Sequence, residues 1–366
     1  MENAAKPNAV QAAERACPHC GQPIPVEAIL CPYCRTVVIA AQEWKPPAVD
    51  RTGTSRESRK NRAWIGWGLL AANLSAAALI GLTLLLNNTS SATGGILISS
   101  DFVLVPFVMD LVSAFFWKSV QLTTMEYFLY SLLNSAGGLV CGGAFMGEGI
   151  ICLLIVSPLL MTFIFLGALT GRWLFRFNSN CLNLSLIPMA LALLTVDVLS
   201  PHHYENVVTD TVVIHAPPAQ VWSHLAAVPL IPDKPSYWLF QMGLPYPTHA
   251  TVTGQGVGAA HQCIFSRHCV FQEKIVAWEP GRRLTFDVTA QPRDPEILGH
   301  ARVKRGQFLL RDNHDGTTTL IGTSWYELSV YPAWYYDLWA SAIARQVHLR
   351  VMDHIKRLSE QKSWRL

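Results

Sequence analysis

The sequence predicts a multidomain membrane protein in which a small cysteine-rich module, an all-α bundle of apolar helices and a carboxy-terminal α+β domain follow one another. Of the 366 residues, 51% are hydrophobic and only 14% are charged, whereas in soluble domains about a quarter of all residues are usually charged. The apolar residues are concentrated between positions 63 and 200, in long runs almost without charge. A net charge of +3 is too small to indicate a nucleic-acid partner.

Four cysteines near the amino terminus have the spacing of a metal site. They lie in the runs Cys17-Pro-His-Cys20 and Cys31-Pro-Tyr-Cys34, with ten residues between the two pairs. Two thiolate pairs on two tight turns can occupy the corners of a tetrahedron, so we expect Cys17, Cys20, Cys31 and Cys34 to bind a structural Zn²⁺ ion. The pattern resembles the small zinc ribbons over residues 17–34. A redox role is the alternative, but no βαβ pattern surrounds the two motifs.

Residues 1–38 therefore form the predicted zinc ribbon, which has no open coordination position and would serve as an interaction module for a protein partner. A basic linker, residues 39–62, follows and is too polar to fold by itself. Its cationic residues are Lys45, Arg51, Arg56, Arg59, Lys60 and Arg62. Positive charge before the first apolar run predicts that this flank faces the cytoplasm.

Five apolar segments are predicted to form transmembrane helices, at 64–86, 96–117, 127–147, 150–171 and 181–200. The first has no charge and, at about 1.5 Å per residue, is long enough for a hydrocarbon core of about 30 Å. The second contains Asp101, Pro106 and Asp110, so an arrangement with four crossings is the alternative. Five crossings in a bacterial plasma membrane place the amino terminus in the cytoplasm and the carboxy-terminal domain outside; four place both in the cytoplasm.

Acidic residues within or beside these segments raise the alternative of a transporter centred on Asp110, with Glu148 and Asp197 at segment ends. The sequence has no intramembrane basic partner for Asp110 and no visible inverted repeat. We therefore favour anchoring and packing over transport.

From residue 206 onward the pattern changes to short strands separated by turns. The predicted strands lie at 207–215, 248–253, 259–267, 270–278, 283–290, 303–311 and 317–330, with a short helix at 219–225 and a long amphipathic helix at 333–360. This order resembles the START/polyketide-cyclase-like (SRPBCC) superfamily over residues 206–361. The resemblance rests on the closing helix and on the runs IHAPPAQVWSHL from Ile214, WEPGRRLTFDV from Trp278 and GTTTLIGTSWYEL from Gly316.

The resemblance implies a helix-grip fold, in which the last helix packs across a curved antiparallel sheet and leaves a cavity for a hydrophobic small molecule or lipid. The residues that correspond to its lining are Trp238, Phe240, Phe265, Phe286, Phe308, Trp325, Tyr335 and Trp339. A core position is the alternative for each of them. Fold alone does not establish function, because relatives in this superfamily include carriers, receptors and cyclases.

The sequence assigns no catalytic residue. The titratable candidates in the carboxy-terminal domain are His261, His268, Glu273, Glu327, His348 and His354, but no Ser-His-Asp order or phosphate loop is recognisable. We expect a membrane-anchored binding protein, with a polyketide-cyclase-like enzyme as the alternative. Cys263 and Cys269 flank a tight turn and would form a disulfide in an oxidising compartment, or a second metal site with the nearby histidines.

Overall fold

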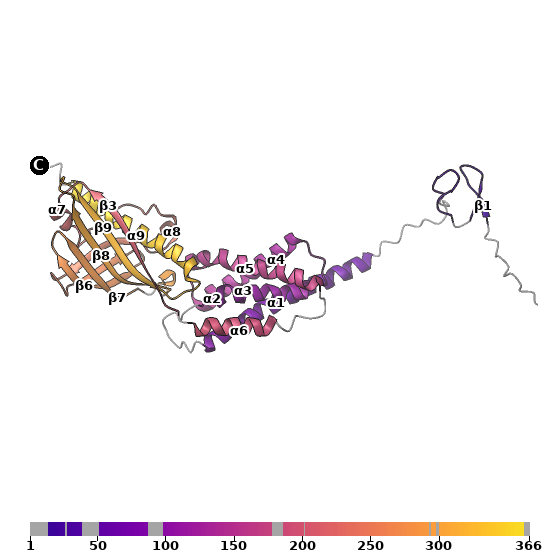
Figure 1. Ribbon diagram of the computed structural model, residues 1–366, viewed down its shortest axis with the longest axis horizontal. Helices are drawn as coiled ribbons and strands as arrows, with labels where there is room; N and C mark the ends of the chain where they lie inside the picture. Colours follow the sequence, from indigo (N-terminus) through magenta and orange to yellow (C-terminus); the bar gives the residue numbers. More distant parts are fainter. Residues whose placement is uncertain are drawn as a thin grey trace, which may run out of the picture. The chain divides into compact units, whose positions relative to one another are not determined.

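The computed structural model describes residues 14–25, 28–38, 51–86, 98–177, 186–200, 202–292, 294–297 and 300–361. The chain divides into two compact units, Met1–Lys60 and Asn61–Leu366. The second unit contains both the apolar helices and the carboxy-terminal sheet (Figure 1).

The first unit holds two cysteine turns of the same geometry. Strands β1 (Glu14–Ala16) and β2 (Pro23–Pro25) form an antiparallel pair before and after the first turn. The residue after each CxxC motif is left-handed, with φ of 75° at Gly21 and 55° at Arg35. Their backbone N–H groups donate to the carbonyl oxygens of Cys17 and Cys31, each over 2.9 Å. The chain therefore folds back at both motifs, as the doubled pattern predicts.

The helices of the second region are α1 (Arg51–Leu86), α2 (Ser99–Phe102), α3 (Leu104–Trp117), α4 (Thr124–Cys141), the π-helix η1 (Gly142–Met146), α5 (Ile150–Phe177) and α6 (Leu186–Leu199). By length and composition, three stretches of the described residues can cross a membrane, Asn61–Thr83, Ser99–Trp117 and Ile150–Arg176. The predicted linker is helical from Arg51 onward, because extending a helix already nucleated in the apolar run costs little. Residues 181–185 of the fifth predicted segment lie outside the described part.

Successive helices alternate in direction. At one end of the bundle, Trp117 Nε1 of α3 donates to Ile65 O of α1 over 3.2 Å. At the other end, Thr83 Oγ1 of α1 donates to Asp101 Oδ1 of α2 over 3.1 Å, and Ser100 N donates to Asp197 Oδ2 of α6 over 2.5 Å. The end of α1, the start of α2 and the end of α6 therefore lie together.

Asp110 forms the centre of a polar cluster between α1, α3 and α4. It is fully buried, and its two carboxylate oxygens accept hydrogen bonds from Ser131 and Asn134. Asn134 also donates to Ser113 Oγ over 2.9 Å and accepts from Asn73 Nδ2 over 3.0 Å. Each side-chain oxygen of Asp110 has a donor, so the cluster supports packing of the helices.

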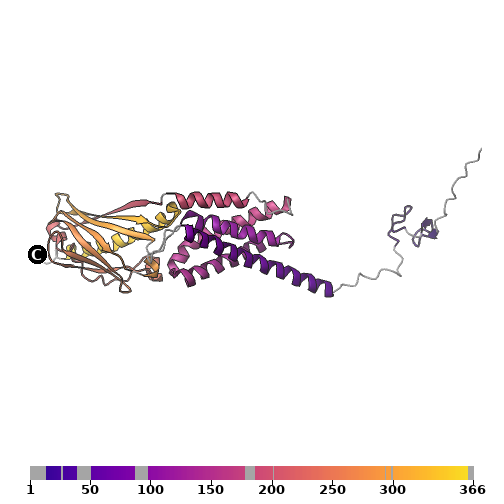
Figure 2. The ribbon, with the colours of Figure 1, turned by 90° about the horizontal axis from the view of Figure 1, so that it is seen from below.

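The carboxy-terminal domain is built on one antiparallel sheet with the strand order β3-β9-β8-β7-β6-β5-β4. Its strands are β3 (Tyr204–Ile214), β4 (Pro247–Thr253), β5 (Ala260–Phe265), β6 (Val270–Glu279), β7 (Arg283–Ala290), β8 (Ala301–Asp312) and β9 (Thr318–Leu328). The helices are α7 (Pro218–Trp222), α8 (Trp238–Met242), the 3₁₀ helix η2 (Pro295–Ile297) and α9 (Ala333–Gln361). Figure 2 shows the curved sheet around α9. This is the helix-grip arrangement that the sequence predicts.

The core of this domain lies between α9 and the concave face of the sheet. Met352 and Ile355 of α9 are fully buried against Ile214, Leu284 and Leu320 from three strands. These apolar side chains fill one end of the space under the helix. The other end is hollow.

Candidate ligand cavity and metal centre

The four predicted zinc ligands lie together. Their sulfur atoms are all within 4.8 Å of one another, with 3.8 Å between Cys17 and Cys34 and 3.6 Å between Cys20 and Cys31. A tetrahedral ion with Zn–S bonds of about 2.3 Å requires sulfur atoms about 3.8 Å apart. The four thiols can therefore hold a metal ion of this kind.

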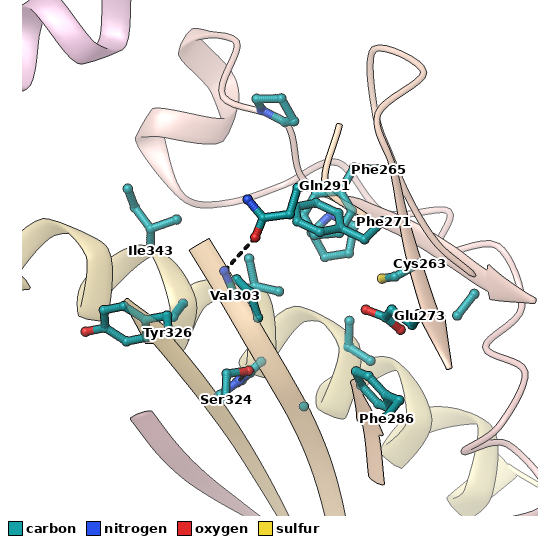
Figure 3. A pocket seen from close by; sticks show the side chains of 18 of the residues that line it. Cys263, Phe265, Phe271, Glu273, Phe286, Gln291, Val303, Ser324, Tyr326 and Ile343 are labelled. Carbon is teal, nitrogen blue, oxygen red and sulfur yellow. Dashed lines mark hydrogen bonds between the residues drawn. The ribbon is translucent and has the colours of Figure 1, made fainter. Parts of the chain in front are cut away.

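A cavity of about 290 Å³ lies between α9 and the sheet. Its wall is mostly aromatic and aliphatic, and the aromatic part consists of Phe265, Phe271, Phe286, Phe308 and Tyr326. Figure 3 shows Ser324 on one side of the cavity and Glu273 with Phe286 on the other. A concave, mostly apolar space with a limited number of polar groups is typical of a small-molecule site.

Three of the eight aromatic residues predicted from the resemblance line this cavity, Phe265, Phe286 and Phe308. Trp325 lies between two lining residues of β9, so strand alternation directs its side chain to the opposite face. Trp238 is 43% exposed.

The remaining three predicted aromatics pack against helix α5. Phe240 and Trp339 belong to an apolar cluster with Ile151, and the Tyr335 hydroxyl donates to Ile155 O over 2.5 Å. These positions therefore lie at the junction with the bundle and outside the cavity lining.

A histidine–carboxylate pair forms one polar feature of the lining. His261 of β5 and Glu273 of β6 face each other in the sheet, and His261 Nδ1 lies 2.5 Å from Glu273 Oε2. Both side chains are less than a tenth exposed, and the His261 ring stacks on Phe286 with centroids 5.0 Å apart. Burial raises the pKa of Glu273, although the hydrogen bond from His261 opposes the shift. The second ring nitrogen of His261, Nε2, is buried without a partner.

A second polar feature joins three elements in a line. His348 Nε2 of α9 lies 2.7 Å from Ser324 Oγ of β9, and His348 Nδ1 lies 2.9 Å from Asp210 Oδ2 of β3. Arg345 Nε donates to the other Asp210 oxygen over 2.9 Å. Burial lowers the pKa of His348, against the opposing effect of Asp210. The atoms have the order of a Ser-His-Asp triad.

The hydrogen-bonded line Ser324–His348–Asp210 lacks an oxyanion hole, which a nucleophilic site also needs. Acyl transfer requires donors placed around a developing oxyanion. Ser324 lies in strand β9, which is paired on both sides with β3 and β8, so the ladder engages the backbone donors around it. We therefore regard the line as a polar connection between the sheet and α9.

The other titratable candidates lie elsewhere. His268 is exposed at the β5–β6 turn with φ of 59°, and Glu327 pairs with Lys304. His354 is buried and lies outside the cavity lining.

The predicted disulfide between Cys263 and Cys269 is wrong, because both are free cysteines. The hairpin register places Cys263 opposite Phe271, and Phe265 N donates to Cys269 O over 2.8 Å. Cys269 therefore lies across from Phe265, two residues from Cys263. Within the described part of the chain, only the four amino-terminal cysteines form a group that can hold a metal, so the alternative of a second metal site in this hairpin is also not supported.

Comparison with known proteins identifies a family for the carboxy-terminal domain. Residues 206–360 match the family described as "Polyketide cyclase / dehydrase and lipid transport", so this part of the chain is an SRPBCC-like domain. No curated protein matches the chain.

Solved structures resemble part of the chain. A protein from Nitrosospira multiformis is 17% identical and covers 44% of this chain and 100% of its own, with a TM-score of 0.30. Norcoclaurine synthase from Thalictrum flavum, in complex with dopamine and hydroxybenzaldehyde, is 12% identical over 43% of this chain and 87% of its own, with a TM-score of 0.30. The Zhui aromatase/cyclase from Streptomyces is 14% identical over 44% and 96%, with a TM-score of 0.32.

Proposed function

We propose that the protein is a membrane-anchored binding protein whose carboxy-terminal domain holds a hydrophobic small molecule with one hydrogen-bonding group. The observation that carries this proposal is a mostly apolar cavity whose wall includes the buried His261, with an Nε2 atom that has no partner. A buried polar atom without a partner costs about 1–3 kcal/mol. A hydroxyl or carbonyl group of a ligand would satisfy it, while Phe265, Phe286 and Phe308 contact the apolar body.

The first test is mass spectrometry of what co-purifies with the full chain. We expect one apolar molecule that carries a hydroxyl or carbonyl group. In the variant His261→Phe its affinity should fall about 10- to 100-fold, since the polar partner is lost and the apolar wall remains. Titration calorimetry with the identified molecule measures this loss. The control His268→Asn changes an exposed histidine in the same hairpin and should bind normally; an unchanged affinity in His261→Phe would refute the anchor.

The His261–Glu273 pair supports a second candidate, a polyketide-cyclase-like enzyme. A carboxyl group whose pKa is raised by burial, hydrogen-bonded to a histidine in an apolar cavity, can exchange protons with a bound substrate. Glu273→Gln removes the titratable group and keeps the shape of the side chain. Conversion of the co-purifying molecule by the natural chain, with binding but no conversion by Glu273→Gln, would establish the enzyme.

For the amino-terminal module we propose a structural Zn²⁺ ion bound by Cys17, Cys20, Cys31 and Cys34. The sulfur spacing supports this. Four thiolates leave no position for a substrate, so the module would present a folded surface to a protein partner.

For the apolar region we propose a bundle that crosses a bacterial plasma membrane five times. The alternating helix directions support an odd number of crossings. Large apolar side chains such as Trp67, Leu74 and Leu133 are more than half exposed, as expected for helices in contact with lipid. With the cationic flank of α1 in the cytoplasm, the carboxy-terminal domain is then extracytoplasmic.

Cysteine labelling in intact cells tests this topology. The reporter is His314→Cys, because the His314 side chain is 89% exposed in the β8–β9 loop, in a background whose native thiols are blocked. We expect labelling by a membrane-impermeant maleimide. The matched reporter Lys118→Cys, between α3 and α4, should be labelled only after the membrane is opened. Protection of the His314→Cys reporter in intact cells would indicate an even number of crossings.

A further inference from the structure

The wall of the cavity is not made by the carboxy-terminal domain alone. Cys152, in the first turn of α5, is a lining residue, beside Glu296 and His300 from the connection between β7 and β8. Helix α5 is also one of the three helices that can cross a membrane. The cavity is therefore a composite of the domain and a candidate membrane span.

The first turns of α5 pack against apolar side chains of the carboxy-terminal domain. Ile151 is 1% exposed and packs with Leu239 and Phe240 of α8. Ile343 and Val347, which also line the cavity, belong to the same cluster. Helix α5 thus contacts both α8 and α9.

Polar contacts fix the same junction. Glu296 Oε2 accepts hydrogen bonds from the backbone N–H groups of Ile151 and Cys152 over 3.0 and 3.3 Å, which satisfies two of the free donors at the start of α5. His300 Nε2 lies 3.0 Å from Glu148 Oε1. At Gly149 an added Cβ would lie 2.2 Å from Glu296 Oε2, so a side chain there would displace the cap.

We infer that the ligand is a single-chain amphiphile of the bilayer, an apolar chain with a hydroxyl or carbonyl group, and that it enters the cavity beside Cys152. This inference rests on the proposed binding function. Ile150, two residues before the cavity-lining Cys152, is 75% exposed, so the apolar surface of the candidate membrane span begins within one helical turn of the cavity wall. A chain that moves along this surface stays out of water, and each CH₂ group kept out of water is worth about 0.8 kcal/mol.

The test uses the full chain in lipid nanodiscs and two photoreactive alcohols that carry a diazirine group. The long-chain alcohol partitions into the bilayer, whereas the short-chain alcohol is also present in water. After illumination, labelled peptides are identified by mass spectrometry. We expect the long-chain alcohol to label β7 and β8 around Phe286 and Phe308, and the variant Cys152→Trp to reduce this labelling at least about tenfold, because the indole fills the entry.

The short-chain alcohol should label the cavity in both forms, which shows that Cys152→Trp still folds. The control Cys141→Trp places the same bulk on an exposed cysteine of α4 and should leave labelling by the long-chain alcohol unchanged. Labelling by the short-chain alcohol alone in the natural chain would refute the bilayer ligand and keep the binding function. Equal labelling of Cys152→Trp by the long-chain alcohol would refute the entry beside Cys152. No cavity labelling by either alcohol would contradict the proposed function itself.

Discussion

Replacement of Cys31 by serine in the full chain should lower the content of the proposed Zn²⁺ ion from one per chain to less than about a tenth, because structural zinc supplies about 10–16 kcal/mol to such modules. The module cannot compensate, since the described part of its core contains little more than Ile24 and Val38 beside the cysteines. Residues 14–38 should therefore lose protection from hydrogen exchange. Metal analysis and exchange mass spectrometry measure the two effects.

The control for this prediction is Cys141→Ser, which removes an exposed cysteine of α4 and should keep one ion per chain. The affinity of the natural chain for Zn²⁺ should also fall at acid pH, because protons compete for the thiolates. One ion per chain that survives the combined removal of Cys31 and Cys34 would rule out the four-cysteine site.

Local chemistry predicted much of the carboxy-terminal fold. Pro280 and Gly281 predict a turn between strands, and Gly281 has φ of 74° with Arg282 N bonded to Glu279 O over 2.9 Å. The stripe of apolar residues predicts the last helix over 333–360, and α9 spans Ala333–Gln361. These signals depend on residues close in the sequence, so one sequence is sufficient to read them.

The lining of the cavity depends on contacts between segments that are far apart in the sequence, and local sequence patterns do not predict such contacts. Trp339 has the helical spacing of a lining residue, yet it packs against Ile151 of α5. The residues around Trp339 in the sequence give no sign of this contact, because α5 is far away along the chain. The line from Ser324 through His348 to Asp210 was missed for the same reason. One signal was present: Asp210 is a charged residue at an inward position of the alternating strand β3, and such a residue requires a buried partner.

The second large effect is expected at Asp210. The variant Asp210→Ala leaves the Nδ1–H of buried His348 without its acceptor and removes the partner of Arg345. Breaking a buried charged network from one side costs about 3 kcal/mol. Hydrogen exchange of the β3 and β9 amides in the full chain should therefore accelerate about a hundredfold, since each 1.4 kcal/mol of opening free energy is about tenfold.

The matched control is Asp287→Ala, which removes an ion pair of the same kind from the outside of the domain. Arg305 Nε lies 2.6 Å from Asp287 Oδ1, but both side chains are more than a third exposed, so water replaces the lost partner and the cost should stay below about 1 kcal/mol. Exchange in β7 and β8 should then accelerate less than about fivefold. Equal effects of the two variants would mean that the Asp210 line does not hold α9 to the sheet.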